Sequence, residues 1–235
     1  MWEDQEDKYG LRPQEITLQL QQNGVDFLDA VYVKAAAEGN WTYTFEKLPL
    51  KDAKGDDYNY RVVEEKVVAY EDPQYATDPD TGSYLITNKL DVIDIPLTKQ
   101  WEDMDNKYGL RPSEIKVQLK QNGNNLFEPV VLSEKDEWKH LFTNLPLLDS
   151  KGTAYVYTFE EHPVAAYETS YKEGLIENTL ILKDVLVKKE WKDSEDKLGL
   201  RPKTITLQLL QNGQAFLDPV VVHTEKGSVQ EVKFA

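Results

Sequence analysis

Apolar and polar residues alternate with a period of two in three stretches of the chain. Residues 16–20 read Ile-Thr-Leu-Gln-Leu, residues 115–119 read Ile-Lys-Val-Gln-Leu, and residues 205–209 repeat the first pattern. A period of two places successive side chains on opposite faces of a β-strand. Each stretch is therefore predicted to form a strand with one buried face.

Each of these predicted strands runs into an Asn-Gly pair, at residues 23–24, 122–123 and 212–213. Asn and Gly both tolerate positive φ, which the tight two-residue turns of β-hairpins require. We therefore expect each strand to turn back on itself in a hairpin at this point.

Other short stretches also have strand character, and no helical apolar stripe of useful length accompanies them. Two alternate around aromatic residues, two are rich in aromatic and β-branched residues, and two read Ile-x-Asn. In that order they are residues 41–45, 138–142, 58–64, 155–161, 86–88 and 176–178. Many short strands separated by turn signals predict an all-β sandwich.

The strand pattern recurs because the sequence itself is repeated. A segment that begins Trp-x-Asp and ends Leu-Arg-Pro starts at Trp2, Trp101 and Trp191, at spacings of 99 (101 − 2) and 90 (191 − 101) residues. Such a period is that of a whole domain rather than of a solenoid repeat. We predict three domains: 1–94, which lacks the start of its first strand; 95–184, which is complete; and 185–235, the N-terminal half of a third. The chain is interpreted as an excerpt of a longer tandem array.

The middle domain carries an ordered set of landmarks. They are Lys99-x-Trp101, Asp103 to Arg111-Pro112, Asn122-Gly123, Trp138, Leu145-Pro146, Tyr157-x-Phe159-x-Glu161 and Ile176-x-Asn178. This set resembles the B-type repeat of the staphylococcal collagen adhesin, the CnaB domain of Gram-positive surface adhesins and pilins. The resemblance implies an all-β fold of tandem inverse immunoglobulin-like (transthyretin-like) β-sandwich domains.

The resemblance also implies a spontaneous isopeptide bond between a lysine on the first strand and an asparagine on the last, promoted by a nearby acid. In the middle domain these residues are Lys99, Asn178 and Glu161. Such a reaction turns over once and uses no cofactor, so the chain is not expected to be an enzyme.

The outer domains hold only parts of this set. The first has Glu64 and Asn88 in the acid and asparagine positions, and its lysine position falls before Met1. The third has Lys189 in the lysine position and no counterpart of the acid or the asparagine. Only the middle domain is therefore predicted to cross-link itself.

The proposed chemistry depends on burial. Desolvation lowers the pKa of a lysine, which exposes a neutral amine, and raises the pKa of a carboxylic acid, which keeps it protonated. A protonated Glu161 would polarise the amide carbonyl and then pass its proton to the departing ammonia. Alternation places Tyr157 and Phe159 on the same face as Glu161, where they would exclude water, and Glu160 on the outer face.

Composition narrows the function classes. The chain has 235 residues, with 42 acidic and 27 basic side chains, a formal charge of −15 and no cysteine. The lack of cysteine excludes disulfides, thiolate metal sites and a cysteine nucleophile. The acidic excess argues against a nucleic-acid or anionic-membrane partner, and no apolar run is long enough for a membrane span.

Two features resemble metal ligands without completing a site. Asp103-x-Asp105-Asn106 resembles the start of a calcium loop, but no Glu stands at loop position twelve, so we expect a solvated turn. The three histidines, His140, His162 and His223, occupy unrelated positions in the repeats, so no metal site is expected.

The leading hypothesis is a structural stalk segment of a cell-wall-anchored adhesin, extracellular on the bacterial surface. Its partners would be neighbouring repeats, with a host extracellular matrix ligand bound by another domain, and the chain would be a monomer. One alternative is a module that itself contacts a host matrix protein or glycan; a secreted hydrolase is another. A further alternative is head-to-tail chains, in which Lys189 of one molecule joins Glu64 and Asn88 of the next.

Overall fold

The structure is a computed structural model that describes residues 1–36, 39–224 and 229–234. Its regular elements are β-strands, apart from one short 3-10 helix, η1 (Glu134–Asp136). Across these ranges no helix has the length and apolar character needed to cross a membrane.

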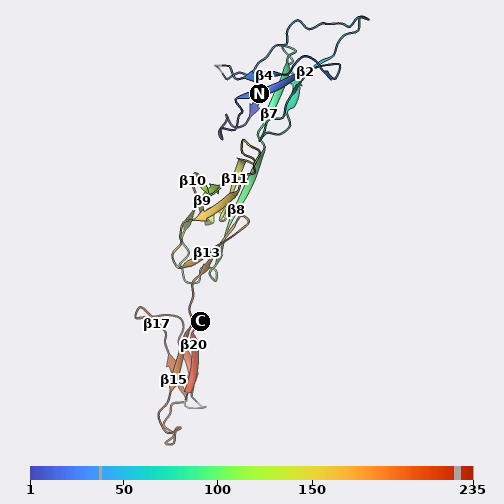
Figure 1. Ribbon diagram of the computed structural model, residues 1–235. Helices are drawn as coiled ribbons and strands as arrows, with labels where there is room; N and C mark the ends of the chain where they lie inside the picture. The colour runs from blue at the N-terminus through green and yellow to red at the C-terminus, as the bar shows by residue number, and fades with distance from the viewer. Residues whose placement is uncertain (37–38, 225–228, 235) are drawn as a thin grey trace. The chain divides into compact units, whose positions relative to one another are not determined.

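The middle repeat is built from two sheets (Figure 1). One has the order β10-β9-β12, with β10 (Asn124–Ser133), β9 (Glu114–Gln121) and β12 (Tyr157–Glu161). The other has the order β11-β8-β14-β13, with β11 (Lys139–Pro146), β8 (Val92–Glu102), β14 (Leu175–Leu180) and β13 (Tyr167–Lys172). Strands β8 and β14, the first and last of the repeat, are parallel neighbours.

Both sheets contribute to one apolar core. Leu97 on β8 and Ile176 on β14 are buried against Val117 on β9 and Leu132 on β10. Alternate residues of each strand point into this layer, as the period-two pattern predicts. The prediction of an all-β sandwich is therefore confirmed.

The three Asn-Gly pairs form the predicted hairpins. Asn122 and Gly123 have φ of 49° and 81°, and the flanking residues Gln121 and Asn124 face each other across the turn. Positive φ at both central residues is the signature of a type I′ turn, whose twist matches that of the strands. The pairs at residues 23–24 and 212–213 have the same pattern of φ values.

The first repeat has the same two-sheet plan, with a shorter first strand and a shorter β6. In one sheet, β2 (Glu15–Gln22) pairs with β3 (Val25–Asp26), β4 (Val31–Lys34) and β5 (Tyr60–Glu64). The other has the order β1-β7-β6, with β1 (Trp2–Glu3), β7 (Tyr84–Lys89) and β6 (Gln74–Thr77). A separate apolar core lies between them.

The strand predicted over residues 41–45 does not form. Its counterpart in the middle repeat, β11, pairs with residues 92–98 of β8. In the first repeat β1 comprises two residues, and these pair with β7, so the segment has no ladder partner. Trp41 nevertheless packs edge-to-face on Trp2, with ring centroids 5.3 Å apart. The alternation correctly marked Trp41 as a residue that packs on the core, where it is half-buried, but did not mark a hydrogen-bonded strand.

The third repeat consists of three strand pairs. These are β15 (Val185–Glu190) with β20 (Val229–Phe234), β16 (Thr204–Leu207) with β19 (Val220–His223), and β17 (Leu210–Gln211) with β18 (Gln214–Ala215). The single strand predicted over residues 205–209 is therefore wrong in its extent, since the strand breaks after Leu207. In the middle repeat the matching strand, β9, is held on its second side by β12. Among the described residues of the third repeat no strand takes that place.

Candidate functional site

The three residues predicted for the middle repeat come together inside the sandwich. Lys99 lies on β8, Glu161 ends β12, and Asn178 lies on β14. Lys99 Nζ is 3.4 Å from Glu161 Oε1, and Asn178 Nδ2 donates a hydrogen bond of 3.2 Å to the same oxygen. The side chains of Lys99 and Glu161 have no exposed surface, and Asn178 is fully buried.

Strand register explains this meeting. In the parallel pair, Lys99 lies opposite Ile176, and Asn178 lies opposite Trp101. Residues two apart on a strand share a face, so the lysine and the asparagine both point into the core. Glu161 enters from the opposite sheet and closes the set.

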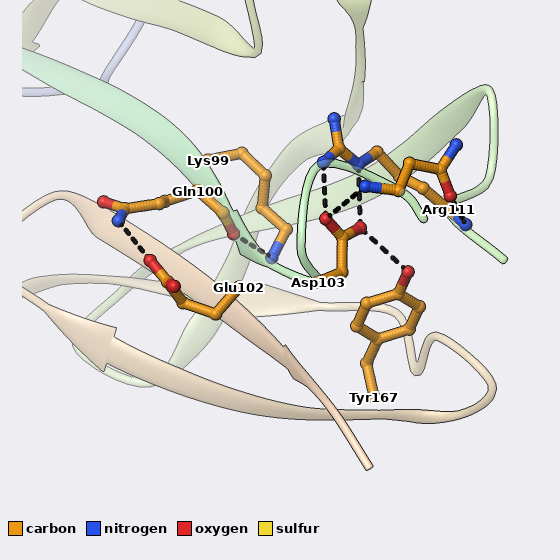
Figure 2. Close-up of polar contacts among 7 residues, drawn as sticks. Lys99, Gln100, Glu102, Asp103, Arg111 and Tyr167 are labelled. Carbon is orange, nitrogen blue, oxygen red and sulfur yellow. Dashed lines mark hydrogen bonds and ion pairs between the residues drawn. The ribbon is translucent and has the colours of Figure 1, made fainter. Parts of the chain in front are cut away.

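Burial changes the charge balance at Lys99. Desolvation lowers its pKa to about 8, although the nearby Glu161 carboxylate works in the opposite direction. Nζ lies 4.4 Å from the centroid of the Trp101 ring and donates a hydrogen bond of 3.3 Å to the Gln100 carbonyl oxygen (Figure 2). The neutral, nucleophilic form of the Lys99 amine therefore forms far more readily here than it would in water.

The Asn178 carbonyl oxygen is buried without a hydrogen-bond partner in the described structure. Such an orphaned acceptor costs about 1–3 kcal/mol. Rotation of the amide about its last side-chain bond would turn this oxygen toward Glu161. A protonated carboxyl could then donate to it and make the amide carbon more electrophilic.

Thr169 also contacts the acid, and the sequence analysis did not identify it. Its hydroxyl donates a hydrogen bond of 2.9 Å to Glu161 Oε2. The backbone N–H of Glu161 donates to the hydroxyl oxygen of Tyr171 at 3.0 Å. Both residues belong to β13, where the buried Tyr167 and the half-buried Thr169 alternate with the exposed Glu168 and Ser170. That period-two pattern is the sequence signal that could have placed Thr169 on the inner face.

The first repeat holds the matching acid and amide. Glu64 and Asn88 are buried, at 4% and 3% exposed. Asn88 Nδ2 lies 3.0 and 3.1 Å from the two oxygens of Glu64. Burial raises the pKa of Glu64, although the hydrogen bond from Asn88 opposes the change. Asn88 Oδ1, like its counterpart in the middle repeat, has no partner in the described structure.

Lys189 in the third repeat is in a different setting. Its Nζ lies 3.8 Å from the Trp191 ring centroid and donates a hydrogen bond of 2.8 Å to the Glu190 carbonyl oxygen. No acid or asparagine of the described residues completes a set around it. In the middle repeat Glu160 lies on the outer face, as predicted. There it forms an ion pair with Lys120.

Asp103, Arg111 and Tyr167 form a second polar cluster (Figure 2), and both Arg111 and Tyr167 also contact the Trp101 ring. Asp103 accepts hydrogen bonds of 2.9 and 2.6 Å from Arg111 and one of 3.0 Å from the Tyr167 hydroxyl. The Arg111 hydrogen bonds lower the pKa of Asp103 to about 2, despite its desolvation. The expected solvated turn is therefore wrong for Asp103, which is 2% exposed. No group of three or more His, Asp or Glu side chains in the described ranges could hold a metal ion.

This cluster supports an otherwise unfavourable turn. Residues 104–106 all have left-handed backbone angles, with φ of 54–58°. Each such residue costs roughly 1–2 kcal/mol, and Asp103 Oδ1 offsets part of this by accepting the Asn106 N–H. Tyr167 also packs edge-to-face on Trp101 at 5.0 Å. The cluster thereby holds Trp101 against Lys99.

The same arrangement recurs in the other repeats. Asp4 binds Arg12 and Tyr70, and Asp193 binds Arg201. The Trp-x-Asp to Arg-Pro landmark therefore encodes a structural ion pair rather than a ligand site.

Comparison with known proteins identifies the repeat. The family model described as Cna protein B-type domain matches residues 1–89, 95–179 and 185–234. A collagen adhesin of Staphylococcus aureus is 31% identical over an alignment 226 residues long, which covers 91% of this chain and 18% of that relative's length.

Two solved structures from the collagen binding surface protein of Staphylococcus aureus are also similar. A single B repeat unit is 31% identical, covers 77% of this chain and 94% of its own, and has a TM-score of 0.37. A pair of B repeat units is 30% identical, covers 98% of this chain and 61% of its own, and has a TM-score of 0.40. On the extent of the family match, the chain belongs to the Cna protein B-type domain family.

Proposed function

We propose that this chain is a stalk segment of a cell-wall-anchored surface adhesin, cross-linked in its middle repeat by a spontaneous bond between Lys99 and Asn178. The observation that carries the proposal is that the buried side chains of Lys99 and Asn178 both contact the same oxygen of Glu161. Lys99 Nζ and Asn178 Nδ2 lie 3.4 and 3.2 Å from that oxygen, away from solvent.

The reaction balances without any outside reagent. Glu161 accepts a proton from the Lys99 ammonium, and the neutral Nζ attacks Cγ of Asn178. The Nζ–Cγ bond forms and the Cγ–Nδ2 bond breaks. Glu161 gives its proton to the leaving nitrogen, which departs as ammonia, and takes up the second proton that Nζ loses as it becomes an amide, so that Glu161 ends as a neutral acid. Holding the groups in contact replaces a collision in water, an advantage that reaches effective molarities on the order of 10⁵ M or more.

The position of the bond suits a chain under tension. Strands β8 and β14 are parallel neighbours, and the repeat is entered through β8 and left through β14. Pulling the chain by its ends therefore draws these two strands past each other in shear. A covalent bond between them would carry the force and spare the hydrogen bonds.

The same bond would also restrict the unfolded chain. It closes a loop of 79 residues (178 − 99). By analogy with disulfides, a loop of this length contributes roughly 4 kcal/mol to the free energy of unfolding.

Several features favour a stalk over a ligand-binding module. The repeats are joined closely, since two residues separate β7 from β8 and four separate β14 from β15. Trp2 and Trp101, at the start of the first and middle repeats, pack edge-to-face on Tyr70 and Tyr167 rather than forming an exposed platform. We infer that the chain's immediate partners are neighbouring repeats and that another part of a longer extracellular protein binds the host matrix, as the names of the relatives suggest.

The intact mass of the purified chain tests the chemical part of this proposal. We expect a mass lower than that of the sequence by one ammonia, and a branched proteolytic peptide that joins Lys99 to Asn178. The Lys99→Met variant, which has no nucleophile, should keep its full mass. A wild-type mass equal to that of the plain sequence would refute the cross-link.

A further inference from the structure

The two carboxyl oxygens of Glu161 have different partners. Oε1 faces Lys99 Nζ at 3.4 Å and Asn178 Nδ2 at 3.2 Å. Oε2 accepts the hydrogen bond of 2.9 Å from the Thr169 hydroxyl. The acid is therefore held in an asymmetric setting, with its reactants on one side and a hydroxyl donor on the other.

This asymmetry decides where a proton sits on the neutral acid. A carboxylic acid has one O–H oxygen, which donates, and one carbonyl oxygen, which is the better acceptor. The Thr169 hydroxyl donates to Oε2 and therefore favours the form in which Oε2 is the carbonyl oxygen. The proton is then on Oε1, the oxygen next to both nitrogens that exchange protons in the proposed reaction.

We propose that Thr169 is a positioning residue for the cross-linking reaction, which orients the Glu161 carboxyl and keeps its transferable proton on Oε1. This inference rests on the proposed function. Thr169 touches neither Lys99 nor Asn178 in any contact described above, so it acts through Glu161 alone.

The first repeat shows the acid without such a residue. The Asn88 amide nitrogen lies at nearly equal distances from the two oxygens of Glu64. Within the part of the chain that the structure describes, no hydroxyl donates to either oxygen. After the shared tyrosine, residues 71–73 read Glu-Asp-Pro where residues 168–170 read Glu-Thr-Ser. The hydroxyl is thus a feature of the middle repeat and not of the fold in general.

The test is a time course of ammonia loss in newly made protein. The full chain is synthesised in a cell-free reaction, quenched in denaturant at intervals and weighed by mass spectrometry. Thr169→Val keeps the shape of the side chain and removes the donor, so we expect cross-linking about tenfold slower, the rate equivalent of one hydrogen bond. Thr169→Ser keeps the donor and should restore most of the rate. Thr158→Val, an exposed position on the same strand as Glu161, should react like wild type.

The outcomes separate the two proposals. A slow Val variant rescued by Ser supports the role of Thr169, because a purely structural role would not depend on the hydroxyl alone. Equal rates for wild type and Thr169→Val would overturn that role while leaving the cross-link intact. If Thr169→Val and Thr169→Ser both slow the reaction, and both also lower the melting temperature of the Lys99→Met protein, the role of Thr169 would be one of packing. A wild-type chain that never loses ammonia would overturn both proposals.

Discussion

The first and middle repeats contain the same buried acid–amide pair, but the two pairs have different surroundings. In the first repeat Asn88 Nδ2 is shared between both oxygens of Glu64. In the middle repeat Asn178 Nδ2 binds one oxygen of Glu161, next to Lys99, and Thr169 occupies the other.

This difference shows that placing the acid beside the amide and supplying the lysine that reacts with the amide are separate steps. The fold brings the acid and the amide together, and leaves the amide oxygen without a partner, even where no lysine is present. The lysine then adds a nucleophile to a site that is already dry and aligned. A comparison of matched changes in the two repeats can therefore isolate what the lysine contributes.

The largest expected effect comes from neutralising each acid in turn. Glu161→Gln removes the group that moves protons between Lys99 and Asn178, so the chain should keep its full mass. Glu64→Gln is the same change in the repeat without a lysine and should leave the loss of one ammonia unaltered. Intact mass spectrometry measures both. Ammonia loss from the Glu161→Gln variant would contradict the role assigned to the acid.

The second test pulls the chain by its ends in a single-molecule force experiment. In wild type the residues between Lys99 and Asn178 should never extend, because the cross-link bypasses them. In Glu161→Gln these 79 residues (178 − 99) should unfold and add roughly 270 Å of length, at about 3.4 Å per residue. Glu64→Gln should leave the extension of the middle repeat as in wild type. Equal extensions in all three proteins would mean that the middle repeat carries force without a cross-link.

Local sequence pattern was a good guide to the strands and the hairpins. A period of two and an Asn-Gly pair describe neighbouring residues, so β2 and β9 and their turns could be predicted directly. Residues 41–45 show the limit of this reasoning, because a strand also needs a partner to bind. The sequence pattern cannot show whether that partner is in place.

The site could be predicted only where the family resemblance reached. Lys99, Glu161 and Asn178 were located from it, and they do lie together. Thr169 and the buried pairing of Asp103 with Arg111 were missed. The contact of Thr169 with Glu161 and that of Asp103 with Tyr167 each join residues distant in sequence. The role of Asp103 was also missed because its spacing from Asp105 resembles the start of a calcium loop.

The third test uses pH to detect the lysine before it reacts. Asn178→Ala blocks the cross-link and leaves Lys99 beside Glu161. The pKa of Lys99 is lowered to about 8 in the folded protein from 10.5. Between these values the unfolded chain binds the extra proton, so the stability of the middle repeat should rise with pH, by about 3 kcal/mol in total.

Urea titrations at each pH can follow this rise through the hydrogen-exchange protection of β14 peptides. The matched control is Asn178→Ala with Lys99→Met, which has no titrating group at this position and should lack the rise. The first repeat, measured through β7 peptides in the same samples, should show no lysine-dependent change. An identical pH response with and without Lys99 would mean that the buried amine is not perturbed.

The smallest expected effect concerns a feature that the two repeats share, the aspartate held by Arg111 in one and by Arg12 in the other. The pKa of Asp103 is lowered to about 2 in the folded protein from 3.8. Its contribution is therefore complete above pH 4 and is lost as the pH falls through 2, an effect of about 2 kcal/mol. In the Lys99→Met background, the stability difference between Asp103 and Asp103→Asn proteins should shrink by that amount from pH 5 to pH 2. Asp4→Asn should change the stability of the first repeat in the same direction, since the pKa of Asp4 is also lowered and its carboxylate binds the corresponding Arg12 and Tyr70. A difference that stays constant with pH would show that the aspartate stabilises the turn through shape and not through its charge.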